Sequence, residues 1–232
     1  MAKSRASRRR NTPGPPPAHT TIPRARVAHA AARLMAENGI QDFRLAKQKA
    51  AARLGVFQDL PRNDEIETAL MAHRRIFDGN AQPQRIRRLR QAAVEAMAFF
   101  QAFDPRLVGP VLRGSAGENA DVNLHLFTDG AEEVEIHLMD HRIPFDAQER
   151  RLREEREIYR DYPAYRFLAD DTPIDLTVFP RKGLRKAPLS PVDGKPMERA
   201  DIQRVRTLIK DSGENTEHAE ARRTQEVFFT EH

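Results

Sequence analysis

Polar side chains that can bind a metal ion alternate with apolar ones near the middle of the chain. Residues 121–127 read DVNLHLF. Successive side chains of a β-strand point to opposite faces of the sheet. A strand here therefore places Asp121, Asn123 and His125 on one face and three apolar side chains on the other. The segment predicts a strand that is half buried and carries a carboxylate, an amide and an imidazole on its polar face.

A later segment has the same pattern and supplies a second carboxylate. Residues 174–179 read IDLTVF, with Asp175 on the polar face. Upstream of both strands lies Gly114-Ser115, where a glycine lets backbone N–H groups approach a phosphate closely. If the two strands are neighbours in one sheet, hard oxygen ligands lie beside a phosphate cradle. Mg²⁺-assisted phosphoryl or nucleotidyl transfer needs such an arrangement.

The elements that must position these residues follow from hydrophobic periodicity and from capping residues. Apolar residues recur at helical spacing in the first half of the chain, and the period changes to two after Asp104-Pro105. Helices are predicted at 23–38, 42–54, 63–77, 83–103, 131–141 and 198–210. Strands are predicted at 106–113 and 121–127, and a hairpin at 164–169 and 174–179, while 144–153 shows no clear period. The arginines at 85–90 are expected to form a solvated flank of their helix.

This order of elements resembles the nucleotidyltransferase superfamily, which has the polymerase-beta-like fold. That family has a helix, a strand that ends in Gly-Ser, a strand with Asp-x-Asp, a helix, and a later strand with a third carboxylate. The resemblance covers about residues 83–180 and rests on order and spacing. It implies that Gly114 and Ser115 hold the nucleotide phosphates, that Asp121 ligates the metals, and that Asp175 ligates one metal and activates the acceptor.

The chain departs from the family pattern at the second carboxylate. Asn123 stands there, and the segment between Gly-Ser and the first Asp is short. The resemblance therefore implies a site for Mg²⁺ or Mn²⁺ with Asp121, Asn123 and Asp175 as ligands, which His125, Glu118 or a group of the substrate completes. Downstream, Lys182 and Arg185 belong to the densest basic cluster of the body. This cluster is either a binding site for a triphosphate or an RNA acceptor, or a solvated loop.

The charge distribution divides the chain into four parts. Residues 1–36 carry eight basic and no acidic side chains, whereas residues 37–210 carry 29 basic and 28 acidic ones. The excess of positive charge thus lies in an N-terminal arm and not on a binding face of the body. We expect an α+β protein with a disordered basic arm (1–20), a helical module (21–80), a nucleotidyltransferase-like mixed or antiparallel sheet flanked by helices (81–210) and an acidic, disordered tail (211–232).

Composition excludes several classes of protein. With no cysteine, the chain has no disulfide framework, thiolate zinc site or cysteine nucleophile. It has no apolar run of about 18 residues, so we expect no membrane partner and a cytoplasmic location. A G-x-x-x-x-G-K-[ST] motif is also absent, which disfavours a P-loop enzyme.

The leading hypothesis is transfer of a nucleotidyl group from an NTP to an acceptor that is a nucleic acid, a protein or a small molecule. One alternative is a catalytically inactive scaffold that binds a nucleotide or a partner. Another is a DNA-binding regulator, because residues 27–57 resemble the opening of TetR-type helix-turn-helix domains. In that case the next segment, 59–67, would present four acidic residues to the DNA phosphates.

Overall fold

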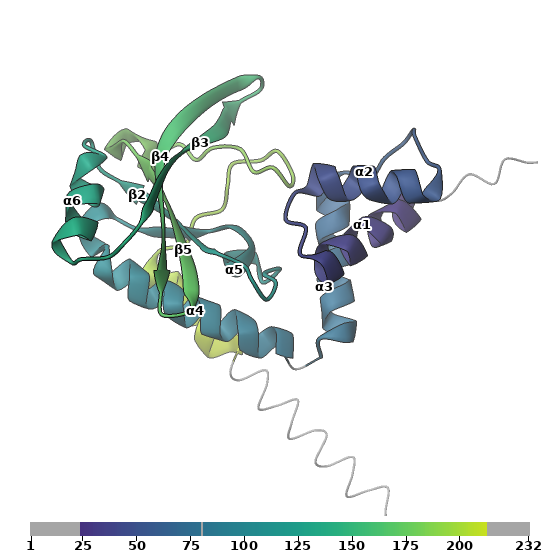
Figure 1. Ribbon diagram of the computed structural model, residues 1–232, viewed down its shortest axis with the longest axis horizontal. Coiled ribbons are helices and arrows are strands. Elements are labelled where there is room, and N and C mark those ends of the chain that lie inside the picture. The colour runs from purple at the N-terminus through teal and green to yellow at the C-terminus, as the bar shows by residue number, and fades with distance from the viewer. Residues whose placement is uncertain (1–23, 80, 213–232) are drawn as a thin grey trace, which may run out of the picture.

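The computed structural model describes residues 24–79 and 81–212 of the chain. The predicted basic arm of residues 1–20 lies outside this part, as do residues 213–232 of the predicted acidic tail. The described residues form a mixed α+β fold in which helices precede a sheet, as the sequence predicts. Figure 1 shows the first three helices gathered on one side and the sheet with its helices on the other.

The N-terminal helical module consists of α1 (Arg24–Asn38), α2 (Phe43–Leu54) and α3 (Asn63–Phe77). Asp42 caps α2, because its carboxylate accepts hydrogen bonds from two backbone N–H groups of the first turn at 2.7 and 3.2 Å. Alanines dominate the core between the helices, and these small side chains let the backbones pack closely. Periodicity and local capping therefore predicted these three helices correctly.

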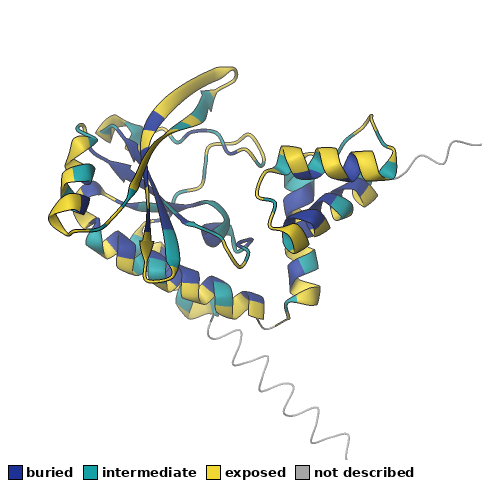
Figure 2. Cartoon of the chain, viewed as in Figure 1, coloured by how far each residue is buried: buried dark blue, intermediate teal, exposed yellow. Residues whose placement is uncertain are grey.

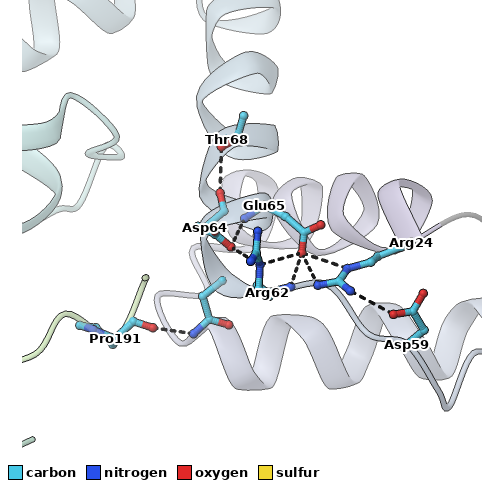
Figure 3. Close-up of polar contacts among 8 residues, drawn as sticks. Arg24, Asp59, Arg62, Asp64, Glu65, Thr68 and Pro191 are labelled. Atoms are coloured by element: carbon cyan, nitrogen blue, oxygen red, sulfur yellow. Dashed lines mark hydrogen bonds and ion pairs between the residues drawn. The ribbon is translucent and has the colours of Figure 1, made fainter. Parts of the chain in front are cut away.

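An ion-pair cluster fixes the start of α3 against the start of α1 (Figure 3). Arg24 donates to Glu65 at 2.7 Å and to Asp59 at 3.0 Å. The Glu65 carboxylate also accepts from the backbone N–H of Arg62 at 2.6 Å. These hydrogen bonds lower the pKa of Glu65, with the backbone bond from Arg62 as the largest cause. The cluster thus ties the predicted acidic segment 59–67 to α1 within the helical module.

The sheet has five strands within the described residues, in the order β1-β2-β5-β4-β3. The strands are β1 (Arg106–Val108), β2 (Val122–Phe127), β3 (Asp146–Glu155), β4 (Ile158–Ala169) and β5 (Thr172–Phe179). β2 and β5 run parallel, and every other neighbouring pair is antiparallel. The sheet is therefore mixed, and its one parallel pair joins the two strands that carry the predicted metal ligands.

Helices cover the apolar face of the sheet. They are α4 (Ala81–Phe99), α5 (Gly109–Arg113), α6 (Glu132–Asp140) and a final helix at residues 202–212. The core forms where apolar side chains of β2 and β5, such as Leu124 and Leu176, meet α4 residues such as Leu89 and Met97. Figure 2 shows buried residues through the centre of the sheet and exposed ones along much of the β3–β4 hairpin. Among the described residues, no helix is both long enough and apolar enough to cross a bilayer.

The predicted strand at 106–113 is wrong in its second half. β1 ends at Val108, and α5 begins at Gly109. Gly109 has φ +76°, which is left-handed backbone that interrupts a strand. Pro110 follows in the first turn of the helix, where its missing N–H costs nothing. The apolar residues that suggested a continuous strand instead form one helical turn packed on the core.

Other boundaries also differ from the prediction. The predicted helix 83–103 is α4 followed by a separate 3-10 turn (Gln101–Phe103), and the predicted final helix 198–210 begins at residue 202. The segment without a clear period, 144–153, forms most of β3. Polar side chains occupy both faces of β3, which removes the alternation that marks a half-buried strand.

The prediction of a solvated arginine flank on α4 fails at Arg90. This side chain is buried, and it donates to the backbone carbonyls of Val111 and Leu112 at 3.3 and 3.0 Å. Burial lowers the pKa of the Arg90 guanidinium. Arg90 therefore satisfies carbonyl groups at the end of α5, a structural role that periodicity does not reveal.

Candidate functional site

The parallel pairing of β2 and β5 brings the predicted polar residues together. In this register Asn123 lies opposite Asp175, and His125 lies opposite Thr177. Because both strands alternate, the same face of the sheet carries all four side chains, with Asp121 immediately before β2. The predicted neighbourhood of the two strands is thus confirmed.

Two arginines from the β3–β4 hairpin form ion pairs with the two carboxylates. Arg150 of β3 donates to Asp175 Oδ2 at 2.6 Å, and Arg166 of β4 donates to Asp121 Oδ1 at 3.0 Å. The positions of these arginines in the sequence did not indicate the contacts. The contacts arise because β4 pairs with β5, which places the β3–β4 hairpin beside the site. Sequence reasoning missed both arginines.

Asp175 is the most deeply buried carboxylate of this site. Its side chain is 3% exposed, and Oδ1 accepts no hydrogen bond from any residue in the described part of the chain. Burial raises the pKa of Asp175 above its usual value, although Arg150 acts in the opposite direction, and the nearby Asp121 charge adds to the rise. Asp175 therefore keeps one buried carboxylate oxygen without a hydrogen-bond partner among the described residues.

Asn123 is the register partner of Asp175 and stands two residues after Asp121. Its Nδ2 donates to the backbone carbonyl of Asp121 at 3.1 Å. This bond directs the amide nitrogen to the backbone and leaves the side-chain oxygen as the atom that can bind a cation. Asp121, Asn123 and Asp175 together supply oxygen ligands of the kind that Mg²⁺ prefers.

His125 is held in one tautomer by Arg199. The Arg199 Nε–H donates to His125 Nδ1 at 3.0 Å, and since arginine can only donate, Nδ1 must present its lone pair. The proton of the neutral ring then lies on Nε2. Burial, with the Arg199 and Arg150 charges, holds the pKa of His125 well below its usual value. A metal ligand needs a free lone pair, which His125 lacks in this arrangement.

Arg199 is itself fixed by its surroundings. Its guanidinium lies over the rings of Phe127 and Phe179, 4.8 and 5.0 Å from their centroids, and donates to the Gly183 carbonyl at 2.7 Å. Burial lowers the pKa of Arg199 to about 10, so it remains a cation at neutral pH. The tautomer of His125 is therefore set by a rigid donor.

The Gly114-Ser115 turn ends α5. Gly114 has φ +80°, and the backbone N–H groups of Gly114 and Ser115 both donate to the Pro110 carbonyl. Ser115 is buried, and its Oγ donates to Glu67 Oε1 at 2.9 Å. The turn lies where the sequence predicts it, but the groups expected to hold phosphate already have partners within the protein.

Charged residues of α3 surround this turn, and sequence reasoning missed them. Glu67 pairs with Arg113 at 2.9 Å, and Arg74 donates to the Ser115 carbonyl. Glu67 and Arg74 lie seven residues apart, so both occupy one face of α3, and both are buried. Two charged residues on an otherwise apolar helix face are the signal that could have identified them.

A cavity of about 900 Å³ lies between the helical module and the sheet, and site residues from both line it. Its walls come from the helical module, from β2, β3 and β5, and from the loop at residues 191–197. The predicted residues that line it are Ser115, Asp121, Asn123, His125 and Asp175. The volume is that of a site for a small ligand such as a nucleotide.

Lys182 and Arg185 do not line this cavity. Both are exposed, in and directly after the 3-10 turn Arg181–Leu184 that follows β5. The cationic side chains that do line it come from elsewhere, and they include Arg113 and Arg150.

The oxygen atoms of Asp121, Asn123 and Asp175 would bind a divalent cation only if a bound ligand supplied further oxygen atoms. In the described ranges, no group of three or more His, Cys, Asp or Glu side chains is placed to hold a metal. Two carboxylates and one amide remain, and phosphate oxygens would complete such a shell.

Comparison of the chain with protein-family models, with curated proteins and with solved structures finds no match.

Proposed function

We propose that the protein transfers a nucleotidyl group from an NTP to an acceptor in the cytoplasm, with Mg²⁺ or Mn²⁺ as cofactor. The observation that carries this proposal is the register of β2 and β5. It places Asn123 opposite Asp175 and Asp121 close by, in the wall of a cavity of nucleotide size. The resemblance in element order to nucleotidyltransferases supports the same conclusion.

The residues of the cavity suit an in-line transfer. A divalent ion bound by the carboxylates would neutralise charge on the triphosphate. The raised pKa of Asp175 suits it to accept the proton of an acceptor hydroxyl. The acceptor oxygen then forms a bond to the α-phosphorus, the bond between that phosphorus and the bridging oxygen breaks, and pyrophosphate leaves. Arg150 lies where a guanidinium can bind a phosphate oxygen.

A second candidate is a scaffold that binds a nucleotide without turning it over. Two observations favour it. Asn123 lacks the charge of a carboxylate, and both carboxylates are already paired with arginines. This candidate shares the ligand of the first and differs only in turnover.

The arrangement of α3 speaks against the DNA-binding alternative. Glu67 and Arg74 are buried, with partners in the Arg113–Ser115 segment of the sheet domain. The start of α3 is acidic and is tied to Arg24. A helix that reads a major groove needs a free face without acidic residues beside the phosphates.

Transfer of label from α-labelled NTPs tests the proposal. With Mg²⁺ or Mn²⁺ and candidate acceptors, Asp121→Ala and Asp175→Asn should each reduce transfer by at least about 100-fold. Asp161→Ala is the matched control, because Asp161 is an exposed carboxylate of the same sheet. Circular dichroism checks that each variant folds.

The two candidates predict different results. Nucleotide binding without transfer by the unaltered protein would favour the scaffold. Equal transfer by the unaltered protein and by both site variants would refute the assignment of Asp121 and Asp175.

A further inference from the structure

A buried carboxylate from the helical module occupies a site built for an anion. Glu67 Oε1 accepts hydrogen bonds from Ser115 Oγ and from Arg113 Nε, each at 2.9 Å. The Glu67 side chain is 11% exposed, and all three residues line the cavity. A hydroxyl and a guanidinium directed at one oxygen are the donors that also bind phosphate.

No donor of the Gly114-Ser115 turn is left for a second anion. The two backbone N–H groups donate to Pro110, and the Ser115 hydroxyl donates to Glu67. A phosphate that enters here must therefore take over bonds that Glu67 makes. A triphosphate carries several negative charges, so it attracts Arg113 more strongly than one carboxylate does.

The module that carries Glu67 is held to the sheet by polar contacts. Among the described residues, the apolar core of α1–α3 shares no member with the core of the sheet. Besides the Glu67 and Arg74 contacts, Gln41 donates to the Asn119 carbonyl at 3.5 Å and Asn63 to the Pro191 carbonyl at 2.7 Å, the latter drawn in Figure 3. Polar contacts between two parts of a chain permit relative motion.

We propose that Glu67 is an autoinhibitory anion, which a nucleotide triphosphate displaces when it binds at Ser115 and Arg113. Displacement breaks the hydrogen bonds of Glu67 with Arg113 and Ser115, and so weakens the attachment of the helical module to the sheet. Nucleotide binding is thereby coupled to opening of the cavity. This inference rests on the proposed function, and it assigns to that site a means of regulation by the helical module.

Substitution of Glu67 tests the competition directly. Glu67→Gln keeps the size of the side chain and an oxygen that accepts hydrogen bonds, but it removes the charge. Isothermal titration with inorganic triphosphate and with each NTP should show at least about tenfold tighter binding by this variant. Glu95→Gln is the matched control, since Glu95 is an exposed residue of α4 that makes the same charge change. Equal or weaker binding by Glu67→Gln would overturn the proposal and would make Glu67 a positioning residue for Ser115.

A cross-link tests the opening independently. Gln41 and Asn119 are exposed residues on the two sides of the cavity, and the chain has no cysteine of its own. A short, cleavable thiol linker across Gln41→Cys/Asn119→Cys should weaken triphosphate binding at least about tenfold, and cleavage should restore it. Identical affinity before and after cleavage would contradict opening.

The outcomes separate this inference from the proposed function. Transfer activity together with unchanged affinity of Glu67→Gln would refute the inference alone. No triphosphate binding and no transfer in any variant would refute both.

Discussion

Loss of the Arg150 guanidinium should destabilise the protein in a way that depends on pH. Arg150 makes the only ion pair of Asp175 found among the described residues, and Asp175 Oδ1 already lacks a partner there. In Arg150→Met a buried carboxylate would remain without compensation. Breaking a buried ion pair costs about 3–5 kcal/mol, and we expect about 3 kcal/mol because the Arg150 side chain is 31% exposed.

The sign of the pH dependence follows from the raised pKa of Asp175. Because the folded state holds this proton more tightly than the unfolded state, stability falls as pH rises from the unfolded pKa through the folded one. Arg150→Met should raise the folded pKa further and widen that interval. Below it, Asp175 is protonated and the variant loses only a hydrogen bond, about 1 kcal/mol. The loss of stability should therefore be about 2 kcal/mol larger above that interval than below it.

Urea unfolding followed by far-ultraviolet circular dichroism measures this effect, since the chain has no tryptophan. The loss of stability should be several times larger at pH 8 than at pH 4. Arg156→Met, an exposed arginine of the β3–β4 turn, should change stability by less than about 0.5 kcal/mol. Arg150→Met/Asp175→Asn should recover most of the loss, because neither charge then remains. An equal loss at both pH values, or additive effects in the double variant, would refute the reasoning.

Three further predictions concern other residues. Long-range ¹H–¹⁵N NMR should find a neutral His125 ring with its proton on Nε2 at pH 6.5, because burial lowers its pKa and Arg199 donates to Nδ1; an imidazolium signal would contradict this. With NTP present, Asn123→Asp should bind Mg²⁺ about tenfold more tightly by calorimetry, since it adds a carboxylate, whereas the exposed control Asn119→Asp should not; equal affinities would argue against the metal site. Arg90→Lys should lower the free energy of unfolding by about 2 kcal/mol in urea, because an ammonium group cannot replace a guanidinium that donates to three backbone carbonyls; a loss below about 0.5 kcal/mol would show that these bonds matter little.

The parts of the fold that local rules specify could be predicted from the sequence. The helices of the module have amphipathic periods and clear ends, and the β2 segment alternates polar and apolar residues in sequence. The prediction that this strand is half buried is wrong, because five of its six residues are buried. The polar face of β2 and β5 followed from the same alternation, on the condition that the strands are neighbours. The register that places Asn123 beside Asp175 fulfils that condition.

The partners of the site residues could not be predicted, because they depend on contacts that are distant in sequence. Arg150 reaches Asp175 only because β4 lies between β3 and β5 in the sheet. Glu67 reaches Ser115 only because the fold brings α3 near the turn that ends α5. Conversely, proximity in sequence suggested Lys182, which lies outside the cavity. Spacing thus identified the polar faces but not the charges that neutralise them.

These neutralising charges share one physical purpose in the structure. Asp175 is paired with Arg150, Asp121 with Arg166, and Arg113 with Glu67. An ionised group that is buried without a partner costs several kcal/mol, and each of these six groups has a counter-charge. A divalent cation together with a triphosphate offers the same charges in complementary positions, with the cation for the aspartates and the phosphates for the arginines. Binding both together would exchange internal ion pairs for external ones at little net cost, whereas either ligand alone would leave charges unmatched. We therefore expect nucleotide and metal to bind this cavity cooperatively.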